Sequence, residues 1–259
     1  MASKITKGIL ISCWIVYLAI LGAVVMVFMA IANGSIGYMP PVEQLENPID
    51  KYASQVISSD GKALGAYAHS KDNRIYVNYE DLSPDLVKAL IATEDIRFAE
   101  HSGIDAQGLF RAVVKRGILM QKSGGGGSTI TQQTVKNIFL SNDRTILRKM
   151  EELALAVQLE KYYTKDQILE LYLNTIYFGH GAYGLKEASL TYFGKEPKDL
   201  DLSQCAMLAG LPQAPSAYDP IDHPKEGAQR MTVVLTLMAQ QGYISPEDAA
   251  KAAMNLWLK

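Results

Sequence analysis

Cysteine is almost absent from this chain, since only Cys13 and Cys205 occur among its 259 residues. One lies in an apolar run and the other far along the chain, so neither a framework of internal disulfides nor a thiolate metal site can be built. The formal net charge is also small, at −2, because 25 Lys and Arg residues nearly balance 27 Asp and Glu residues. The composition therefore argues against a redox function and gives no reason to expect a nucleic-acid partner.

Charged residues are absent from one long segment, Ile9 to Ala32. A helix of about 24 residues at about 1.5 Å each is roughly 36 Å long, enough to cross a hydrocarbon layer of about 30 Å. Lys4 and Lys7 precede it, and the positive-inside bias then leaves the N-terminus in the cytoplasm. A cleaved signal peptide is the alternative, because Ala30-Ile31-Ala32 resembles a cleavage site, but the run exceeds a signal core of about 7 to 15 residues.

We therefore expect a single-pass protein of the cytoplasmic membrane, with its main domain on the periplasmic or extracellular side. The expected parts are a cytoplasmic tail (residues 1–8), a transmembrane helix (9–32), a juxtamembrane linker (33–52) and one domain (53–259).

Local signals predict that this domain is mainly α-helical, with a small β element at its start. Between Gln55 and Tyr79, β-branched and aromatic residues flank Asp60-Gly61, a dipeptide typical of hairpin turns. Downstream, Ser83 followed by proline indicates a helix start, and Thr164 with Gln167 forms a capping box.

The first predicted helix carries an acid where its apolar stripe should continue. Val87, Leu90 and Ile91 mark the stripe, and the next position at helical spacing is Glu94. Burying an unpaired carboxylate is costly, so either the helix ends in solvent there or the acid lines a cavity that uses it. A cavity is favoured by the compact acid, aromatic and imidazole cluster that follows, formed by Asp95, Phe98 and His101.

Glycines open a second polar segment. Gly124 to Gly127 leads into Ser128-Thr129-Ile130-Thr131-Gln132-Gln133. Glycines let backbone N–H groups approach an anion, and a helix start adds a favourable dipole. A plain linker is the alternative for the glycines alone. No Gly-Lys-Ser/Thr follows them, so the segment is not a P-loop, which argues against a nucleoside triphosphate as the ligand.

A third cluster, Arg148-Lys149-Met150-Glu151-Glu152, places two cations and one carboxylate on one helical face. The simpler interpretation is a surface ion pair contributing about 0.2 to 0.5 kcal/mol. The surrounding sequence argues against a simple surface pair, because residues 110–149 contain eight basic side chains and a single acid, Asp143. Such a stretch indicates an anionic ligand or an anionic membrane face.

Together these segments resemble the peptidoglycan glycosyltransferases, the polymerase module of class A penicillin-binding proteins and of monofunctional enzymes. Five segments match in the family's order: EDIRFAEHSG (94–103), GGSTITQQ (126–133), RKMEE (148–152), KDQILELYLN (165–174) and the set Arg230, Val234, Leu235 and Met238. The likeness covers roughly Ala53 to the C-terminus. It implies a lysozyme-like helical lobe beside a smaller amphipathic lobe that faces the membrane, which suits the basic and apolar residues between Phe110 and Arg144.

The resemblance also implies the chemistry: an inverting transfer that polymerises lipid II, a polyprenyl-diphosphate-linked disaccharide-peptide, into β-1,4 glycan and releases polyprenyl diphosphate. Glu94 is expected to act as general base on the acceptor hydroxyl. Glu152 is expected to assist the diphosphate together with Lys149, Arg148 and Lys136, and to hold a divalent cation such as Mg²⁺ or Mn²⁺. No organic cofactor is expected. The candidate substrate-binding residues are Asp95, Phe98, His101, Ser128, Thr129, Gln132, Gln133, Lys136, Asn137, Arg148, Lys149 and Arg230.

Three alternatives fit parts of the sequence. A lysozyme-type glycosidase also uses two carboxylates, but cleaving neutral glycan needs no diphosphate site. A penicillin-reactive serine enzyme is mimicked by three short motifs in the wrong order and context: Ser59-Asp60-Gly61-Lys62, Lys122-Ser123-Gly124 and Tyr172-Leu173-Asn174. A membrane-tethered module could dock other cell-wall synthesis proteins without catalysis. Besides lipid II and the growing glycan strand, the expected partners are membrane lipids and other cell-wall synthesis proteins.

Geometry offers a check on the proposed chemistry. Acceptor activation and departure of the diphosphate occur on opposite sides of one anomeric carbon, so Glu94 and Glu152 should face one cleft. By analogy with inverting glycosidases, we expect their carboxyl groups to be about 6.5 to 9.5 Å apart or more. The cations should lie nearer Glu152 than Glu94.

Overall fold

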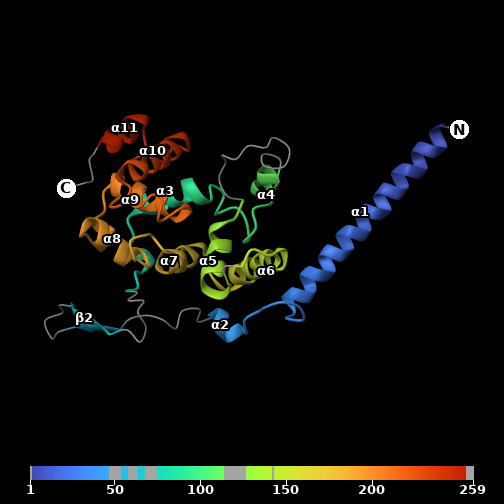
Figure 1. The fold of residues 1–259 in the computed structure, drawn as a ribbon, viewed down its shortest axis with the longest axis horizontal. Helices are drawn as coiled ribbons and strands as arrows, with labels where there is room; N and C mark the ends of the chain where they lie inside the picture. Colours follow the sequence, from blue (N-terminus) through green and yellow to red (C-terminus); the bar gives the residue numbers. More distant parts are fainter. Residues whose placement is uncertain are drawn as a thin grey trace.

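The structure, a computed structural model, describes residues 2–46, 54–57, 63–67, 75–113, 127–141 and 143–254. A long N-terminal helix projects from a body of packed helices (Figure 1). The prediction of a mainly α-helical chain is confirmed. The lysozyme-like character of its lobes stays a prediction.

The N-terminal helix, α1, runs from Ala2 to Ala32. Within the described residues it is the one helix long and apolar enough to cross a membrane, over Lys7–Ala32. Its large apolar side chains between Ile9 and Met26 are exposed, which is consistent with a membrane-spanning helix. Ile31, close to its C-terminal end, is fully buried because that end packs against helix α6 (Ile146–Tyr162).

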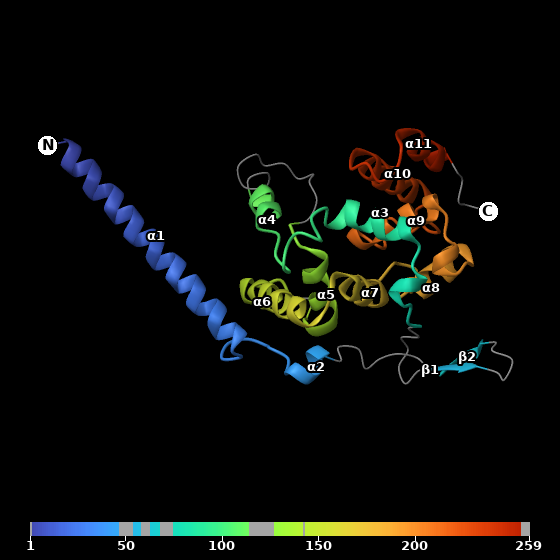
Figure 2. The same cartoon turned by 180° about the vertical axis from the view of Figure 1, so that it is seen from behind.

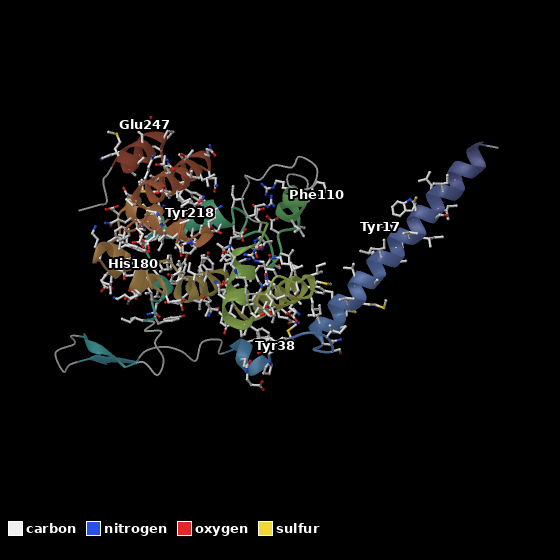
Figure 3. All side chains as sticks on the ribbon, viewed as in Figure 1. Tyr17, Tyr38, Phe110, His180, Tyr218 and Glu247 are labelled. Carbon is white, nitrogen blue, oxygen red and sulfur yellow. The ribbon has the colours of Figure 1, made fainter. Side chains whose placement is uncertain are left out.

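Much of the predicted juxtamembrane linker is docked rather than free. After α1 the chain forms the short helix α2 (Val42–Glu46), which also contacts α6 and buries Leu45 in the core. Figure 3 shows Tyr38 beside α2, below the end of α1. Helix α1 is therefore joined to the helical body through packed contacts as well as through the chain.

Two short strands follow, β1 (Ser54–Ile57) and β2 (Ala63–Tyr67). They pair antiparallel with Ser54 opposite Tyr67, and they lie apart from the helical body (Figure 2). The predicted turn at Asp60-Gly61 falls outside the described residues, so the hairpin connection stays a prediction.

The helical body begins with η1 (Tyr79–Asp81), and Ser83 then precedes Pro84 at the first position of α3, as predicted. The capping box of Thr164 and Gln167 at the start of α7 is also confirmed. The remaining elements are α3 (Pro84–Glu94), α4 (Ala106–Val113), α5 (Ile130–Phe139), α6, α7 (Lys165–Thr175), α8 (Leu185–Phe193), η3 (Pro197–Asp199), α9 (Leu202–Gly210), η4 (Leu211–Gln213), α10 (Pro224–Gln240) and α11 (Pro246–Met254).

Two groups of helices share one hydrophobic core. In the first group α3 packs against α9 and α10, and in the second α5 packs against α6 and α7. Leu90, Leu208 and Leu235 represent the first group in the core, and Leu155 and Tyr172 represent the second. Glu94 ends α3 and contacts α5 and α10, so it lies where the two groups meet.

Candidate active site

Glu94 is the last residue of α3, and its side chain is 13% exposed. Gln133 on α5 donates a hydrogen bond from Nε2 to Glu94 Oε2 at 2.8 Å. Arg230 on α10 brings Nη2 to 3.9 Å from Oε1. Burial raises the pKa of Glu94 above the usual glutamate value, while Gln133 and Arg230 act in the opposite direction. The carboxyl group therefore holds a proton more readily than a surface glutamate does.

Both partners of Glu94 are themselves held in place. The Tyr172 hydroxyl donates to Gln133 Oε1 at 3.2 Å, which leaves the amide nitrogen of Gln133 facing Glu94. Arg230 donates from Nε to the Gly210 carbonyl at 3.1 Å, and its guanidinium lies over the Tyr218 ring at 5.7 Å. Tyr172 was not among the predicted site residues, because its position in a helical apolar pattern indicates only a core residue.

The cluster after Glu94 connects α3 to α5. Asp95 is buried and accepts hydrogen bonds from His101 Nε2 at 2.9 Å and from the Ile130 backbone N–H at 3.0 Å. Phe98 is in the core, with the His101 ring edge-on to it. Because surrounding atoms cover Asp95 and Phe98, these contacts position the start of α5. They do not present the two side chains to a substrate.

The same holds for two of the predicted residues at the start of α5. Thr129 caps the helix by accepting a hydrogen bond from Gln132 N, and its hydroxyl donates to the Gly103 carbonyl at 2.7 Å. Gln132 Nε2 donates to the same carbonyl at 3.3 Å, and both side chains are buried. Gly103 has φ +89°, and a Cβ there would lie 2.7 Å from the Ala156 carbonyl oxygen, so glycine is required for this approach.

Glu152 on α6 is 2% exposed and is paired with two cations. Arg148 Nη2 lies 2.7 Å from Oε2, and Lys149 Nζ pairs with Oε1. Lys149 also donates to Ser128 Oγ at 2.8 Å and to Gln132 Oε1 at 3.3 Å. The predicted association of Arg148 and Lys149 with Glu152 is confirmed. Unlike a surface ion pair, this one would leave an uncompensated buried charge if either partner were removed.

Arg148 has N–H groups that its ion pair with Glu152 does not use. Its Nε and Nη1 are buried and have no hydrogen-bond partner within the part of the chain that the structure describes. Buried N–H groups are usually paired, so unpaired ones call for an explanation. Both atoms are covered by their surroundings, so a ligand could reach them only if neighbouring side chains moved.

Helix α5 joins the two carboxylates. Gln133 contacts Glu94, and its neighbour Gln132 contacts Lys149, which pairs with Glu152. Lys136 and Asn137 lie one turn further along α5, half-buried and exposed respectively. The two acids thus border one helix, and a shared cleft and the separation of their carboxyl groups stay predictions.

The predicted metal site at Glu152 does not fit the geometry. Both carboxylate oxygens already pair with cations, from Arg148 and Lys149. A divalent ion would meet two like charges and would have to displace one of them to gain a single carboxylate ligand. No chemical step is therefore assigned to a metal at this position.

One residue beside Glu152, its neighbour Glu151, was not among the predicted site residues. Glu151, next to Glu152, is buried and accepts a hydrogen bond at Oε1 from the Tyr38 backbone N–H at 2.8 Å. Gly37 has φ +76°, and a Cβ there would lie 2.1 Å from that oxygen. The segment after α1 is thus fixed directly to the helix that carries Arg148, Lys149 and Glu152.

Two comparisons with known proteins point to the same family. A family model described as transglycosylase matches residues 60–239. Penicillin-binding protein 1F of Bacillus subtilis is 46% identical over 200 residues, covering 77% of this chain and 28% of that protein. Penicillin-binding protein 1A of Escherichia coli is 43% identical over 210 residues, covering 81% of this chain and 24% of that protein. The chain thus spans about a quarter of the length of these relatives.

A crystal structure of penicillin-binding protein 1A from Haemophilus influenzae is also similar, with 27% identity over 80% of this chain and 21% of that chain. Its TM-score of 0.45 is too low to carry an argument about the fold.

Proposed function

The chain belongs to the transglycosylase family, and on this premise we propose that it is a peptidoglycan glycosyltransferase that polymerises lipid II into β-1,4 glycan strands. The observation that carries the proposal is the contrast between two acids of low exposure that border α5. Glu94 has one amide donor and a distant guanidinium, whereas Glu152 is enclosed by Lys149 and Arg148. Such an arrangement suits a base at one end of the reaction and an anionic leaving group at the other.

Glu94 is the general base in this mechanism. The acceptor sugar 4-hydroxyl attacks the anomeric carbon of the donor, and its proton passes to a Glu94 carboxylate oxygen as the new C–O bond forms. The raised pKa of Glu94, caused mainly by burial, brings its basicity closer to that needed for proton transfer near neutral pH. Gln133, oriented by Tyr172, holds one carboxylate oxygen so that the other can face the acceptor.

The opposite bond breaks at the donor's diphosphate. The electron pair of the cleaved C–O bond leaves on a diphosphate oxygen, where Lys149 and Arg148 stabilise the charge. Lys136 on α5 and Ser128 just before α5 are further candidates for contacts with the glycosyl donor. One displacement inverts the anomeric carbon and needs no covalent enzyme intermediate.

The membrane is the proposed location of this reaction. Helix α1 would span the bilayer with the N-terminus in the cytoplasm. On α4, Leu109, Phe110 and Arg111 are exposed, which suits an element that meets the interface of the same membrane (Figure 3 labels Phe110). Lipid II, the growing strand and membrane lipids are accordingly the proposed partners, together with other cell-wall synthesis proteins.

The testing experiment is incubation of the purified full chain in detergent with purified lipid II, followed by separation of the glycan products by size. We expect long strands from the wild type and none from Glu94→Gln. Absence of polymer from the wild type would overturn the proposal. Release of soluble sugar fragments from purified cell wall would instead favour a glycosidase.

A further inference from the structure

Outside the candidate active site, an imidazole and two carboxylates converge from separate loops. His180 lies in the loop between α7 and α8, where Tyr177 and Tyr183 form an antiparallel bridge. The Phe178 N–H donates to the Ala182 carbonyl at 2.9 Å and closes the turn. His180 stands at its tip with φ +48°, in the left-handed region that non-glycine residues seldom adopt, although Asn, Asp and His do so more often than the others.

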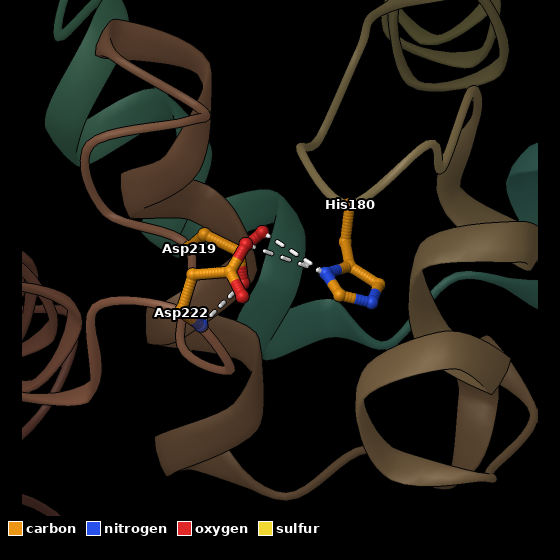
Figure 4. A group of neighbouring side chains, drawn as sticks. All are labelled: His180, Asp219 and Asp222. Atoms are coloured by element: carbon orange, nitrogen blue, oxygen red, sulfur yellow. Dashed lines mark hydrogen bonds and ion pairs between the residues drawn. The ribbon is translucent and has the colours of Figure 1, made fainter.

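The carboxylates come from the loop before α10. Asp219 accepts both of its backbone hydrogen bonds at Oδ1, from Ile221 N at 2.9 Å and Asp222 N at 3.4 Å. Its other oxygen, Oδ2, points at His180 Nδ1 from 3.4 Å, and Asp222 Oδ2 is 3.8 Å from the same nitrogen (Figure 4). The Asp219 side chain is only 3% exposed. A nearly buried carboxylate oxygen is thus aimed at the space between the three side chains.

The spacing matches a metal-ligand set. One candidate ligand atom from each residue lies within 4.8 Å of the other two. Two ligands bound to Zn²⁺ at about 2.1 Å and a tetrahedral angle are about 3.4 Å apart, so little movement would bring all three onto one ion. Asp222 and His180 are partly exposed, at 62% and 40%, which leaves a side open for water as a fourth ligand. Within the described residues, no Lys or Arg pairs with either carboxylate.

We propose that His180, Asp219 and Asp222 bind a divalent transition-metal ion, with Zn²⁺ the best fit to one imidazole and two carboxylate ligands. The contrast with Glu152 is direct, because there one carboxylate faces two cations. Here two carboxylates face a single imidazole nitrogen, His180 Nδ1. The hydrogen bonds to Asp219 Oδ1 orient the ligand oxygen, as outer contacts do at metal sites.

The ion would link two loops, one of which supports the candidate active site. Tyr218, next to Asp219, places its ring under the guanidinium of Arg230, and Arg230 faces Glu94. Bound metal would fix the loop that carries Tyr218 to the loop between α7 and α8. The role assigned to the metal is therefore structural, and it involves no step of the transfer reaction.

Calorimetric titration of Zn²⁺ into the metal-free full chain in detergent tests the proposal. We expect one saturable site in the wild type. Asp219→Asn keeps an acceptor for the two backbone N–H groups but replaces the ligand oxygen by NH₂, and His180→Asn suits the left-handed backbone. Each variant should bind Zn²⁺ about 100-fold more weakly or worse. His223→Asn, an exposed histidine outside the group, is the matched control and should bind as the wild type does.

Thermal unfolding separates loss of the site from loss of the fold. Without metal, Asp219→Asn, His180→Asn and His223→Asn should each unfold near the wild-type temperature. Zn²⁺ should raise the Tm of the wild type and of His223→Asn but not that of the two ligand variants. Glu152→Gln should retain the site. The proposal is wrong if the wild type takes up no Zn²⁺, or if folded Asp219→Asn and His180→Asn bind it with wild-type affinity. Loss of binding in Glu152→Gln alone would place the metal at Glu152 and also overturn it.

Discussion

Glu94 and Glu152 are both acids with little solvent exposure beside α5, yet their surroundings differ in kind. Glu94 receives one hydrogen bond from a neutral amide, and its nearest cation, Arg230, is 3.9 Å away. Glu152 has a cation on each oxygen. A carboxylate that is buried without full compensation can exchange a proton, whereas one that is fully paired serves to hold the paired cations in place. The difference assigns base chemistry to the first and diphosphate stabilisation to the second.

Removing the base should have the largest effect. Glu94→Gln keeps the size of the side chain but cannot accept the acceptor proton, so turnover should fall by about 10²- to 10⁴-fold while the fold is retained. Initial rates of lipid II polymerisation measure the fall, and circular dichroism checks the fold. Glu100→Gln, an exposed acid in the same segment, is the control and should keep its activity. A Glu94→Gln enzyme with near wild-type turnover would remove this residue from the mechanism.

Breaking the pairing at Glu152 should reduce stability as well as activity. Arg148→Met leaves a buried carboxylate with Lys149 as its remaining ionic partner, which we expect to cost about 1 to 3 kcal/mol of unfolding free energy. Denaturant unfolding measures the change. Arg144→Met, which removes an exposed cation just before the same helix, should change stability by less than about 0.5 kcal/mol. Equal stability of the two variants would mean that Glu152 does not need its pair.

The amide that holds Glu94 should control its titration. Gln133 lowers the pKa that burial raises, so Gln133→Met should raise the pKa of Glu94 further. Because the base must be ionised, the acid limb of the pH–rate profile should move to higher pH. Tyr172→Phe, which removes only the hydroxyl that orients Gln133, should shift it less in the same direction. A shift toward lower pH in either variant would contradict this arrangement.

The same raised pKa affects stability. A carboxyl group whose pKa is raised by folding contributes stability that is complete below the ordinary glutamate pKa and is lost as the pH rises through the raised value. Wild-type stability should therefore decline over that window, and the contribution should be missing from Glu94→Gln. Parallel Tm profiles of the two proteins across pH would show that burial of Glu94 has no such cost.

The docking of the anchor should give the smallest effect, and two glycines allow a matched test. Gly37→Ala and Gly34→Ala both place a side chain at positive φ, costing about 1 to 2 kcal/mol locally. At Gly37 alone the new Cβ would also collide with Glu151 Oε1, whereas at Gly34 the nearest atom is 4.0 Å away. Gly37→Ala should thus lower activity on bilayer-embedded lipid II several-fold more than Gly34→Ala does. Equal activities would mean that docking of this segment on α6 does not matter for the reaction.

Local signals explain what the sequence predicts well. The proline after Ser83 and the capping box at Thr164 act within one helical turn, so the helix starts are predicted correctly. The i,i+3 and i,i+4 spacing likewise places Lys149 and Arg148 on Glu152.

Long-range contacts are what local patterns cannot supply. Glu151 and Glu152 are adjacent, yet about 100° of helical rotation sends one to the juxtamembrane segment and the other to the cations. The burial of Thr129 depends on Gly103, which is 26 positions away in the chain. The convergence of His180 with Asp219 likewise depends on how two loops pack, which neither loop's sequence specifies.

The division of roles between the two acids can be measured with a donor whose leaving group needs no cationic assistance, such as the disaccharide fluoride. With lipid II as donor, Glu94→Gln and Glu152→Gln should both be impaired. With the fluoride donor, the deficit of Glu152→Gln should shrink by about tenfold or more, while Glu94→Gln should stay about 10²- to 10⁴-fold below the wild type, because the acceptor hydroxyl still needs a base. An unchanged deficit in Glu152→Gln, or recovery of Glu94→Gln, would contradict the assignment of base and leaving-group roles.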